Sequence, residues 1–260
     1  MPEDLSALLC LDGRVALVTG GGRGIGRAIT ETLLAAGCTV TICGRSTPET
    51  LPEAGGVRAE FVSCDVRAAD QVRAMVDGIV ERHGRIDIVV NNAGGSPNAE
   101  AATASPRFSE AIVALNLLAP LHVAQAANRH MQAQADGGGI VNIASVSGAR
   151  PSPGTAAYGA AKAGLLNLTR SLAMEWGPRV RVNAIVAGLI ATEAAADHYG
   201  SEAGRAAIAA MLPLGRMGAG QDIARAVLYL ASPLAAYVSG AHLNVDGGGE
   251  RPSFLDLADA

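Results

Sequence analysis

A tyrosine and a lysine stand four residues apart in this sequence, as Tyr158 and Lys162. In a helix, that spacing places both side chains on one face, where they can contact each other. A free tyrosine has a pKa of about 10, which is too high for a proton carrier at neutral pH. Because a nearby ammonium favours the phenolate, the pair predicts a general acid/base whose pKa the lysine lowers.

Two other polar residues extend this group. Ser145 stands thirteen residues before Tyr158, at the end of an apolar run that predicts a strand. A hydroxyl there can donate a hydrogen bond to a carbonyl oxygen and hold it for attack. Taken singly, a helical Tyr–Lys pair, a strand-end serine or a helical asparagine such as Asn116 has an ordinary structural explanation. Their combination behind a glycine-rich loop favours a catalytic group.

The glycine-rich loop is TGGGRGIG, at residues 19–26. Gly20, Gly24 and Gly26 stand where a tight turn, a close approach of phosphate and close helix packing each exclude a side chain. A helix that follows such a loop presents free N–H groups and the positive end of its dipole to a pyrophosphate. Because this loop lies between a predicted strand and a predicted helix, it predicts a dinucleotide site.

These residues must be positioned by the alternating strands and helices around them. We expect helices at 24–36, 70–83, 107–134, 156–176 and 221–231. We expect strands at 14–20, 38–44, 57–66, 86–95, 137–148, 180–188 and 241–248, with no full helix between the second and third. Continuous Val and Ile runs are typical of a parallel sheet covered on both faces. The predicted fold class is therefore a doubly wound α/β Rossmann fold of about seven strands.

Composition restricts the remaining classes. The chain has 260 residues, 49% of them hydrophobic, which suits one large domain over 1–260 with a substrate-covering insert near 189–215. A net charge of −4 argues against a nucleic-acid partner. We expect no membrane-spanning run and, because the start MPEDLSALLC is acidic, no signal peptide, so we expect a cytoplasmic protein. Cysteines and histidines show no metal-ligand spacing, and Cys38, Cys43 and Cys64 are expected to be buried.

The ordered motifs resemble the short-chain dehydrogenase/reductase family over roughly residues 11–249. The resemblance rests on the TGxxxGxG loop, on NNAG at 91–94, and on Ser145 followed by the motif from Tyr158 to Lys162. It implies hydride transfer between a nicotinamide cofactor and a ketone or secondary alcohol. Tyr158 would be the general acid/base, helped by the positive charge of oxidised nicotinamide, and Ser145 would orient and polarise the carbonyl.

The resemblance also implies roles for other residues. Lys162 would bind the nicotinamide ribose, Asn116 would hold a water that links Lys162 to solvent, and Asn91 would steady the central sheet. Asp65 matches an acid that contacts adenine. The implied cofactor contacts are Gly20, Gly22, Arg23, Gly24, Ile25, Gly26, Arg45, Asp65, Val66, Asn92, Ala93, Gly94, Tyr158, Lys162, Gly188, Ile190 and Thr192. Ala187 replaces the family's proline, which leaves the rigidity of the following insert open.

The end of the second predicted strand, TVTICGRS at 39–46, bears on the choice of cofactor. Gly44 stands where an acid would bind the 2′-hydroxyl of NAD and repel a 2′-phosphate. Arg45 follows it, and Arg23 approaches the same ribose from the glycine loop. Since guanidinium groups suit a phosphate, NADP(H) is favoured and NAD(H) stays the alternative, because Arg45 can instead cap a turn.

The substrate is less defined. The insert at 193–215 and the loop at 95–108 carry small and apolar residues, which favour a small, uncharged, apolar ketone or alcohol. A 3-oxoacyl-thioester reductase and a steroid, terpenoid or sugar dehydrogenase stay open. Arg150 is expected in a surface salt bridge rather than in contact with substrate. The Ala and Leu content of the predicted helices at 107–134 and 156–176, with the family resemblance, predicts a homotetramer.

Two other function classes fit less well. An epimerase or dehydratase of the same family is disfavoured, because such relatives usually resemble a longer form with TGxxGxxG spacing. A non-catalytic, redox-sensing binding protein is disfavoured because this sequence holds all four predicted catalytic residues, Asn116, Ser145, Tyr158 and Lys162.

Overall fold

Seven parallel strands form the central sheet of the computed structural model, which describes residues 5–193 and 199–252. Their order across the sheet is β11–β8–β7–β6–β1–β2–β5. The strands are β1 (Val15–Thr19), β2 (Thr39–Gly44), β5 (Glu60–Ser63), β6 (Ile88–Asn91), β7 (Gly138–Ser145), β8 (Val180–Ala187) and β11 (His242–Val245). The predicted doubly wound parallel sheet is therefore confirmed.

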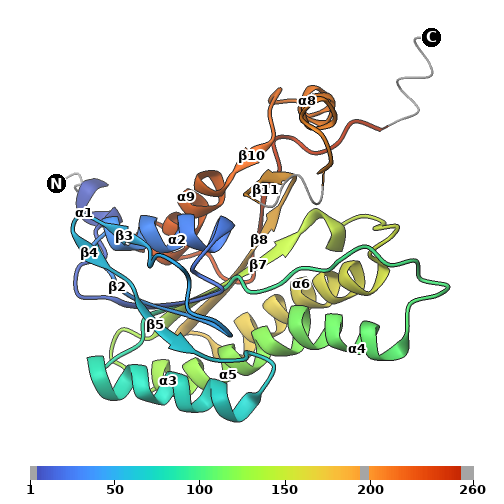
Figure 1. The fold of residues 1–260 in the computed structure, drawn as a ribbon. Helices are drawn as coiled ribbons and strands as arrows, with labels where there is room; N and C mark the ends of the chain where they lie inside the picture. Colours follow the sequence, from blue (N-terminus) through green and yellow to red (C-terminus); the bar gives the residue numbers. More distant parts are fainter. Residues whose placement is uncertain (1–4, 194–198, 253–260) are drawn as a thin grey trace, which may run out of the picture.

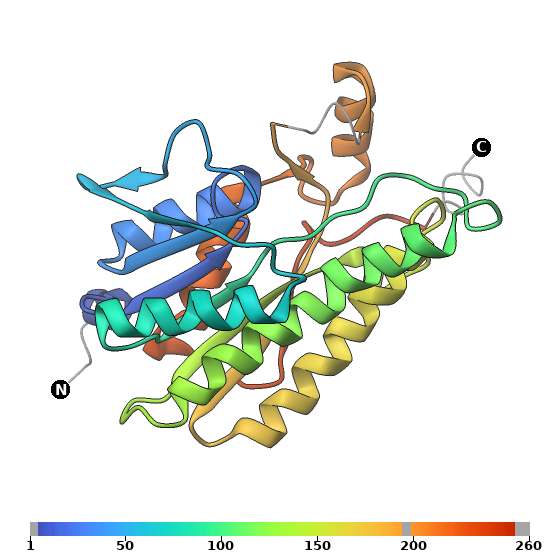
Figure 2. The same cartoon turned by 60° about the horizontal axis from the view of Figure 1, so that its bottom comes forward.

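Helices cover both faces of this sheet (Figures 1 and 2). On one face, α2 (Gly24–Ala35) packs against α9 (Gly220–Ala231), while α3 (Ala69–His83), α5 (Ala119–Met131) and α6 (Ala156–Trp176) cover the other. Alternation along β1 explains the two layers, since Ala16 and Val18 join one buried cluster, whereas Val15 and Leu17 join the other. The sheet is thus buried on both sides, which accounts for its continuous apolar strands.

The topology opens a ligand site between β1 and β6. From β1 the chain crosses to β2 on one side, and it later returns to place β6 on the other. Such a reversal leaves a crevice at the carboxyl ends of the two strands, where doubly wound proteins bind ligands. The glycine loop follows β1 and the NNAG motif begins at the end of β6, so both motifs lie at that crevice.

The prediction of a third strand over 57–66 was wrong at its N-terminal end. Val57 and Arg58 form β4 (Val57–Arg58), which pairs antiparallel with β3 (Glu53–Ala54), and β5 begins only at Glu60. Gly55 and Gly56 both have positive φ, at 58° and 78°, and this turn conformation costs glycine little. A short hairpin therefore occupies the segment where no full helix was expected.

The long helix predicted at 107–134 is interrupted. It consists of α4 (Pro106–Val113), a π-helical segment (Ala114–Leu118) and α5, with Ser105 capping its start through the Phe108 N–H at 3.2 Å. The stretch Pro106–Met131 is long and apolar enough to qualify as a membrane span by length and composition, contrary to the expectation from sequence. Because α5 packs against α3 and β6, we interpret the stretch Pro106–Met131 as part of the protein core rather than as a membrane span.

The insert near 189–215, which was predicted to cover the substrate, is bordered by a small second sheet. Within it, β9 (Ile190–Ala191) pairs in parallel with β10 (Gly218–Ala219), and α8 (Glu202–Met211) lies between them in sequence. In Figure 1, α8 stands above the end of the sheet, beyond β10 and β11. A short helix, α1 (Leu5–Leu9), was not predicted. The helix predicted at 221–231 matches α9 to within one residue.

Candidate active site

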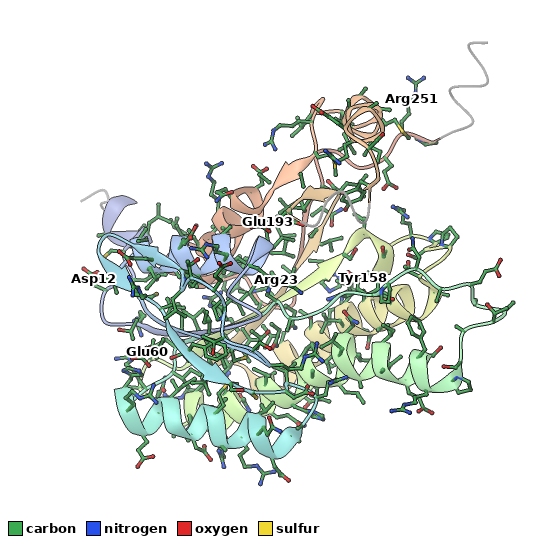
Figure 3. The ribbon with its side chains drawn as sticks, viewed as in Figure 1. Asp12, Arg23, Glu60, Tyr158, Glu193 and Arg251 are labelled. Carbon is green, nitrogen blue, oxygen red and sulfur yellow. The ribbon has the colours of Figure 1, made fainter. Side chains whose placement is uncertain are left out.

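Tyr158 and Lys162 lie together near the start of α6, as their spacing predicted. The ammonium nitrogen Nζ of Lys162 is 5.6 Å from the centre of the Tyr158 ring. The same nitrogen donates a hydrogen bond of 2.7 Å to the main-chain oxygen of Ile143 in β7, and Lys162 is only 3% exposed. In Figure 3, Tyr158 lies beside the segment that crosses from β6 toward α4. A buried lysine thus anchors the tyrosine-bearing helix to the central strand.

Ser145 completes the group at the last position of β7. Its hydroxyl accepts a hydrogen bond from the Ser147 N–H at 3.1 Å and shares a side-chain hydrogen bond with Tyr158. Close packing of the turn after β7 against α6 makes this approach feasible. A Cβ placed on Gly148 would come within 2.7 Å of the Ala163 main-chain nitrogen, so only glycine fits there.

The ionisation of this group differs from the expectation for the tyrosine. Burial raises the pKa of Tyr158, a side-chain hydrogen bond with Ser145 lowers it, and the nearby Tyr199 raises it, with a net increase. Burial alone lowers the pKa of Lys162 to about 8. The expectation that Lys162 lowers the tyrosine pKa is therefore not met in the protein alone, because desolvation outweighs other effects and the ammonium is directed to Ile143.

Asn116 holds the backbone after β6 in place. Its side-chain amide donates 2.9 Å hydrogen bonds to the main-chain oxygens of Gly95 and Ile112, and its oxygen Oδ1 accepts one of 2.9 Å from the Gly95 N–H. A Cβ placed on Gly94 would come within 2.7 Å of Asn116 Oδ1 and 3.3 Å of Lys162 Nζ. Asn116 and Lys162 therefore meet across Gly94, and the π-helical segment directs Asn116 toward it.

The glycine loop fits the pyrophosphate that the sequence predicts. Gly20 and Gly24 have φ of 65° and 52°, which is the left-handed region that favours glycine. A Cβ on Gly26 would lie 2.2 Å from the main-chain oxygen of Gly20. Arg23 precedes α2 without a side-chain cap, so its side chain leaves the first N–H groups of the helix available to a pyrophosphate.

Thr19 and Asn92 fasten this loop to β6. The Thr19 hydroxyl accepts 3.0 Å hydrogen bonds from the N–H groups of Asn92 and Ala93. The Asn92 side chain donates in turn to the main-chain oxygens of Thr19 and Gly20, at 2.9 and 3.2 Å. Asn92 was predicted to bind the cofactor, and in the structure its amide shapes the glycine loop. Thr19 was missed, although its place at the head of TGGGRGIG marks it.

Asn91 has the structural role that was expected. It donates to Asn142 Oδ1 at 2.9 Å and to the Pro120 main-chain oxygen at 3.1 Å. Asn142 donates in turn to the Thr169 hydroxyl at 2.9 Å. These buried contacts join β6, β7, α5 and α6 beneath the predicted catalytic group.

Asp65 and Val66 follow β5 at the far end of the crevice. The Asp65 carboxylate pairs with Arg67 at 2.6 Å and accepts a hydrogen bond from the Arg67 N–H at 3.0 Å. The pKa of Asp65 is lowered to about 2, chiefly by the hydrogen bond from the Arg67 side chain. Burial opposes this change, whereas the Arg67 N–H and the charge of Arg45 reinforce it. Val66 is 7% exposed and joins a core cluster. Arg67 was not anticipated as a partner of the adenine-contacting acid.

The predicted nicotinamide segment lies across the crevice from α2. A Cβ on Gly188 would come within 2.5 Å of the Asp246 Cα, so β8 and β11 end in close contact there. A Cβ on Gly24 would lie 3.6 Å from the Thr192 Cγ2 and 3.7 Å from the Glu193 carboxylate. Figure 3 labels Glu193 close to the start of α2. Ile190 is buried in the core, and Ala187 stays within β8, opposite Ser145 and Val245.

Known proteins share this arrangement. A family model described as enoyl-(acyl carrier protein) reductase matches residues 20–250. The chain is 40% identical over 253 residues to an uncharacterized oxidoreductase of Mycobacterium tuberculosis, covering 95% of each chain. It is 36% identical to a 3-oxoacyl-[acyl-carrier-protein] reductase of Chlamydia trachomatis, covering 92% of this chain and 98% of the relative. The chain belongs to the short-chain dehydrogenase/reductase family.

A solved structure supports the same assignment. The ligand-free aldohexose dehydrogenase of Thermoplasma acidophilum superposes with a TM-score of 0.85 at 32% sequence identity, over 92% of this chain and 94% of that one. As a member of the short-chain dehydrogenase/reductase family, the chain is an oxidoreductase that acts on CH–OH groups with a nicotinamide cofactor. Within the described residues, no three His, Cys, Asp or Glu side chains gather as metal ligands.

A pocket of about 190 Å³ opens beside the turn that follows Ser145, and among the described residues its lining includes none of Ser145, Tyr158 and Lys162. It opens among the turn after Ser145, the end of β8, the end of α8 and the segment after β11. Its lining is Val146, Ala149, Arg150, Val186, Gly188, Leu189, Leu212, Asn244, Asp246, Gly249 and Glu250. The insert contributes Leu189 and Leu212. The loop at 95–108, also expected here, instead donates from the Ala99 N–H to the Gly154 oxygen at 2.8 Å.

Proposed function

We propose that this protein interconverts a ketone and a secondary alcohol with NADP(H), using Tyr158 as general acid/base. The observation that supports this most is the union of Ser145, Tyr158 and buried Lys162 at the carboxyl end of β7. These three residues lie at the same edge of the sheet as the glycine loop. A non-catalytic binding protein has no need for a buried lysine beneath a tyrosine, because burying an ammonium is costly.

The residues divide the work of carbonyl reduction. A bound nicotinamide would supply the hydride and, in its oxidised form, a positive charge. Ser145 donates a hydrogen bond to the substrate oxygen, and Tyr158 transfers its proton to that oxygen as the carbon–hydrogen bond forms. Lys162, with a pKa of about 8, is able to exchange a proton near neutral pH. Asn116 holds the Gly94–Gly95 backbone beside that ammonium.

The preference for NADP(H) is supported at the end of β2. Arg23 and Arg45 are both exposed, and no salt bridge between either one and an acid is found among the described residues. A Cβ on Gly44 would come no closer than 3.7 Å to other atoms, so the missing acid is not excluded by space. Two exposed guanidinium groups favour a 2′-phosphate, and Asp65, the acid on which the charge of Arg45 acts, is itself paired with Arg67.

The substrate proposal remains a small carbonyl or alcohol compound with an apolar body. Val146, Val186, Leu189 and Leu212 supply apolar wall to the pocket. A 3-oxoacyl-thioester reductase is our first candidate, in line with the relative from Chlamydia trachomatis. A sugar dehydrogenase is the second, because the aldohexose dehydrogenase of Thermoplasma acidophilum superposes over most of the chain.

The test is a panel of ketones, 3-oxoacyl thioesters, secondary alcohols and aldoses, assayed with NADPH or NADP⁺ and followed by nicotinamide absorbance. We expect reduction of at least one ketone or thioester, with lower efficiency for NADH. Lack of turnover across the panel, by a protein that binds NADPH, would contradict the proposal and favour a binding role.

We also propose a homotetramer. Leu118 in the π-helical segment is 43% exposed, and Met174 on α6 is 87% exposed, so the helices expected to pair carry uncovered apolar side chains. Tyr237, shortly before β11, is fully exposed and suits a second contact near the C-terminal strand. Light scattering at micromolar concentration checks this. A monomeric mass would contradict it.

A further inference from the structure

The pocket beside Ser145 changes character along its length. Its apolar part lies between the turn after β7 and the end of β8. Its opposite part holds charged and polar side chains, namely Arg150, Asn244, Asp246 and Glu250. Such a division suits a molecule with an apolar body and a charged end. The two segments from which an uncharged substrate was expected do not include this polar end.

Arg150 makes only part of the contacts that its shape allows. Its Nη2 donates to Glu250 Oε1 at 2.5 Å, and its Nη1 donates to the Pro151 main-chain oxygen at 3.0 Å. The expected salt bridge is thus present, but with one contact rather than a fork. Guanidinium carries five N–H donors and binds a carboxylate best through two parallel bonds. Its side chain is 40% exposed, and no further hydrogen bond from its guanidinium is found among the described residues.

Glu250 reaches Arg150 from a segment that glycine makes adaptable. Gly247, Gly248 and Gly249 precede it, with φ of 69°, 96° and 81°. Three successive glycines adopt other backbone conformations at little cost. Glu250 is therefore a counter-ion that can leave Arg150 without disturbing a strand or helix.

The ion pair lies within reach of the reaction centre. Tyr199 is close enough to Tyr158 to contribute to the rise in its pKa, and Glu250 contributes in the same way to the rise in the pKa of Tyr199. The pocket itself begins at Val146, the residue after Ser145. Tyr199 therefore interacts electrostatically with both Tyr158 and Glu250, and Glu250 is hydrogen-bonded to Arg150.

We propose that Arg150 binds the carboxylate of the substrate, which is then an oxo acid or hydroxy acid with an apolar chain. Glu250 forms an ion pair with Arg150 until the substrate carboxylate displaces it. This inference rests on the proposed function, and it names a free acid as substrate in place of the thioester and the sugar. Asp246, which accepts a 3.1 Å hydrogen bond from the Gly248 N–H, is a second acid at this end of the pocket. Because Glu250 competes with the substrate carboxylate for Arg150, removing the charge of Glu250 should strengthen carboxylate binding.

The first experiment measures binding without turnover. Hexanoate and hexanamide are titrated into the full chain with NADP⁺ bound, by ligand-observed NMR. We expect hexanoate to bind roughly tenfold more tightly, as befits a charge-assisted contact. Arg150→Met should abolish this difference, Arg150→Lys should keep part of it, and Glu250→Gln should enlarge it. Equal binding of the two probes, or a difference that survives in Arg150→Met, would overturn the inference.

The second experiment measures turnover of oxo acids of four to seven carbons and of their methyl esters. Arg150→Met should raise KM for the acids roughly tenfold, with kcat and the ester constants nearly unchanged. Esters turned over as well as acids by the wild type would refute the inference and leave the proposed function intact. Arg150-dependent binding of hexanoate without turnover of any compound would instead support the carboxylate site and count against the proposed function.

Discussion

The predicted catalytic end and the predicted adenine-ribose end of the crevice are built in opposite ways. Around Tyr158, the supporting polar groups are buried and hydrogen-bonded, with Lys162 at 3% exposure and Asn116 fully buried. At the end of β2, Arg45 is exposed, as is Arg23 across the loop. Buried polar groups cost stability unless every partner is in place, whereas exposed charges cost little.

This difference separates reaction from cofactor choice. A change in the buried group should alter the chemistry and the fold together, because Lys162 is hydrogen-bonded to the Ile143 backbone and Asn116 to the Gly95 backbone. A change at Gly44 or Arg45 should alter which nucleotide binds and leave the chemical step alone. The comparison therefore predicts large effects on turnover at one end and moderate effects on cofactor preference at the other.

The largest effect is expected for Tyr158→Phe. This change removes the proton carrier but leaves the ring packed beside Lys162. Turnover should fall by roughly 10²–10⁴-fold, as is typical for a lost acid/base group. Steady-state kinetics on a good substrate measure it, and fluorescence titration with NADPH is the control, which should barely change. Near-normal turnover in the variant would show that Tyr158 is not the general acid/base.

Lys162→Met should change how stability depends on pH. Burial lowers the pKa of Lys162 to about 8 in the folded protein, from its ordinary value of 10.5, so the unfolded chain binds more protons between these values. Wild-type stability relative to the variant should therefore rise as pH increases from 8 to 10.5, by up to roughly 3 kcal/mol. Urea unfolding at several pH values checks this. A difference that is flat or falls over that window would contradict the buried lysine.

Gly44→Asp should shift cofactor preference toward NADH. The new carboxylate has room, since a Cβ there lies at least 3.7 Å from its neighbours. Repulsion of the 2′-phosphate should lower kcat/KM for NADPH relative to NADH by roughly five- to tenfold. Gly44→Asn is the matched control, with the same shape and no charge, and it should shift the ratio much less. An equal shift in both variants would show that shape, not charge, is responsible.

Arg45→Ala should give the smallest of these effects. Removing one exposed guanidinium should raise KM for NADPH roughly threefold and leave KM for NADH nearly unchanged, because Arg23 remains. The effect should weaken at high salt, which screens exposed charges. Arg58→Ala, on the β4 strand of the hairpin, serves as a control for the loss of a surface cation. An unchanged KM for NADPH would show that Arg45 does not contact the 2′-phosphate and serves only the turn after β2.

The sequence predicted the buried end of the crevice better than its surroundings. Helical spacing joined Tyr158 to Lys162, and the end of an apolar strand placed Ser145 beside them, because both depend on local periodicity. The interruption of the long helix around Asn116 was not predicted, since its apolar pattern continues across the π-helical segment. Likewise, the β9–β10 pairing joins short segments far apart in sequence, which no local pattern reveals.

Partners of exposed or strand-end residues were the hardest to predict. Arg67 pairs with Asp65 only because the chain turns after β5, and Glu250 meets Arg150 across 100 residues of sequence. The tyrosine pKa was expected to fall because charge proximity was weighed without desolvation. The structure shows that burial is the larger effect in the protein alone.

The central claim is that the buried group performs the reaction while the exposed corner selects the nucleotide. One set of measurements tests it most directly, namely kcat/KM with NADPH and with NADH for the wild type, Tyr158→Phe and Gly44→Asp on one substrate. We predict that Tyr158→Phe lowers both values by the same large factor, leaving their ratio unchanged. Gly44→Asp should change the ratio and keep kcat. A wild type that is more efficient with NADH, or a Tyr158→Phe variant that changes only the ratio, would contradict the account.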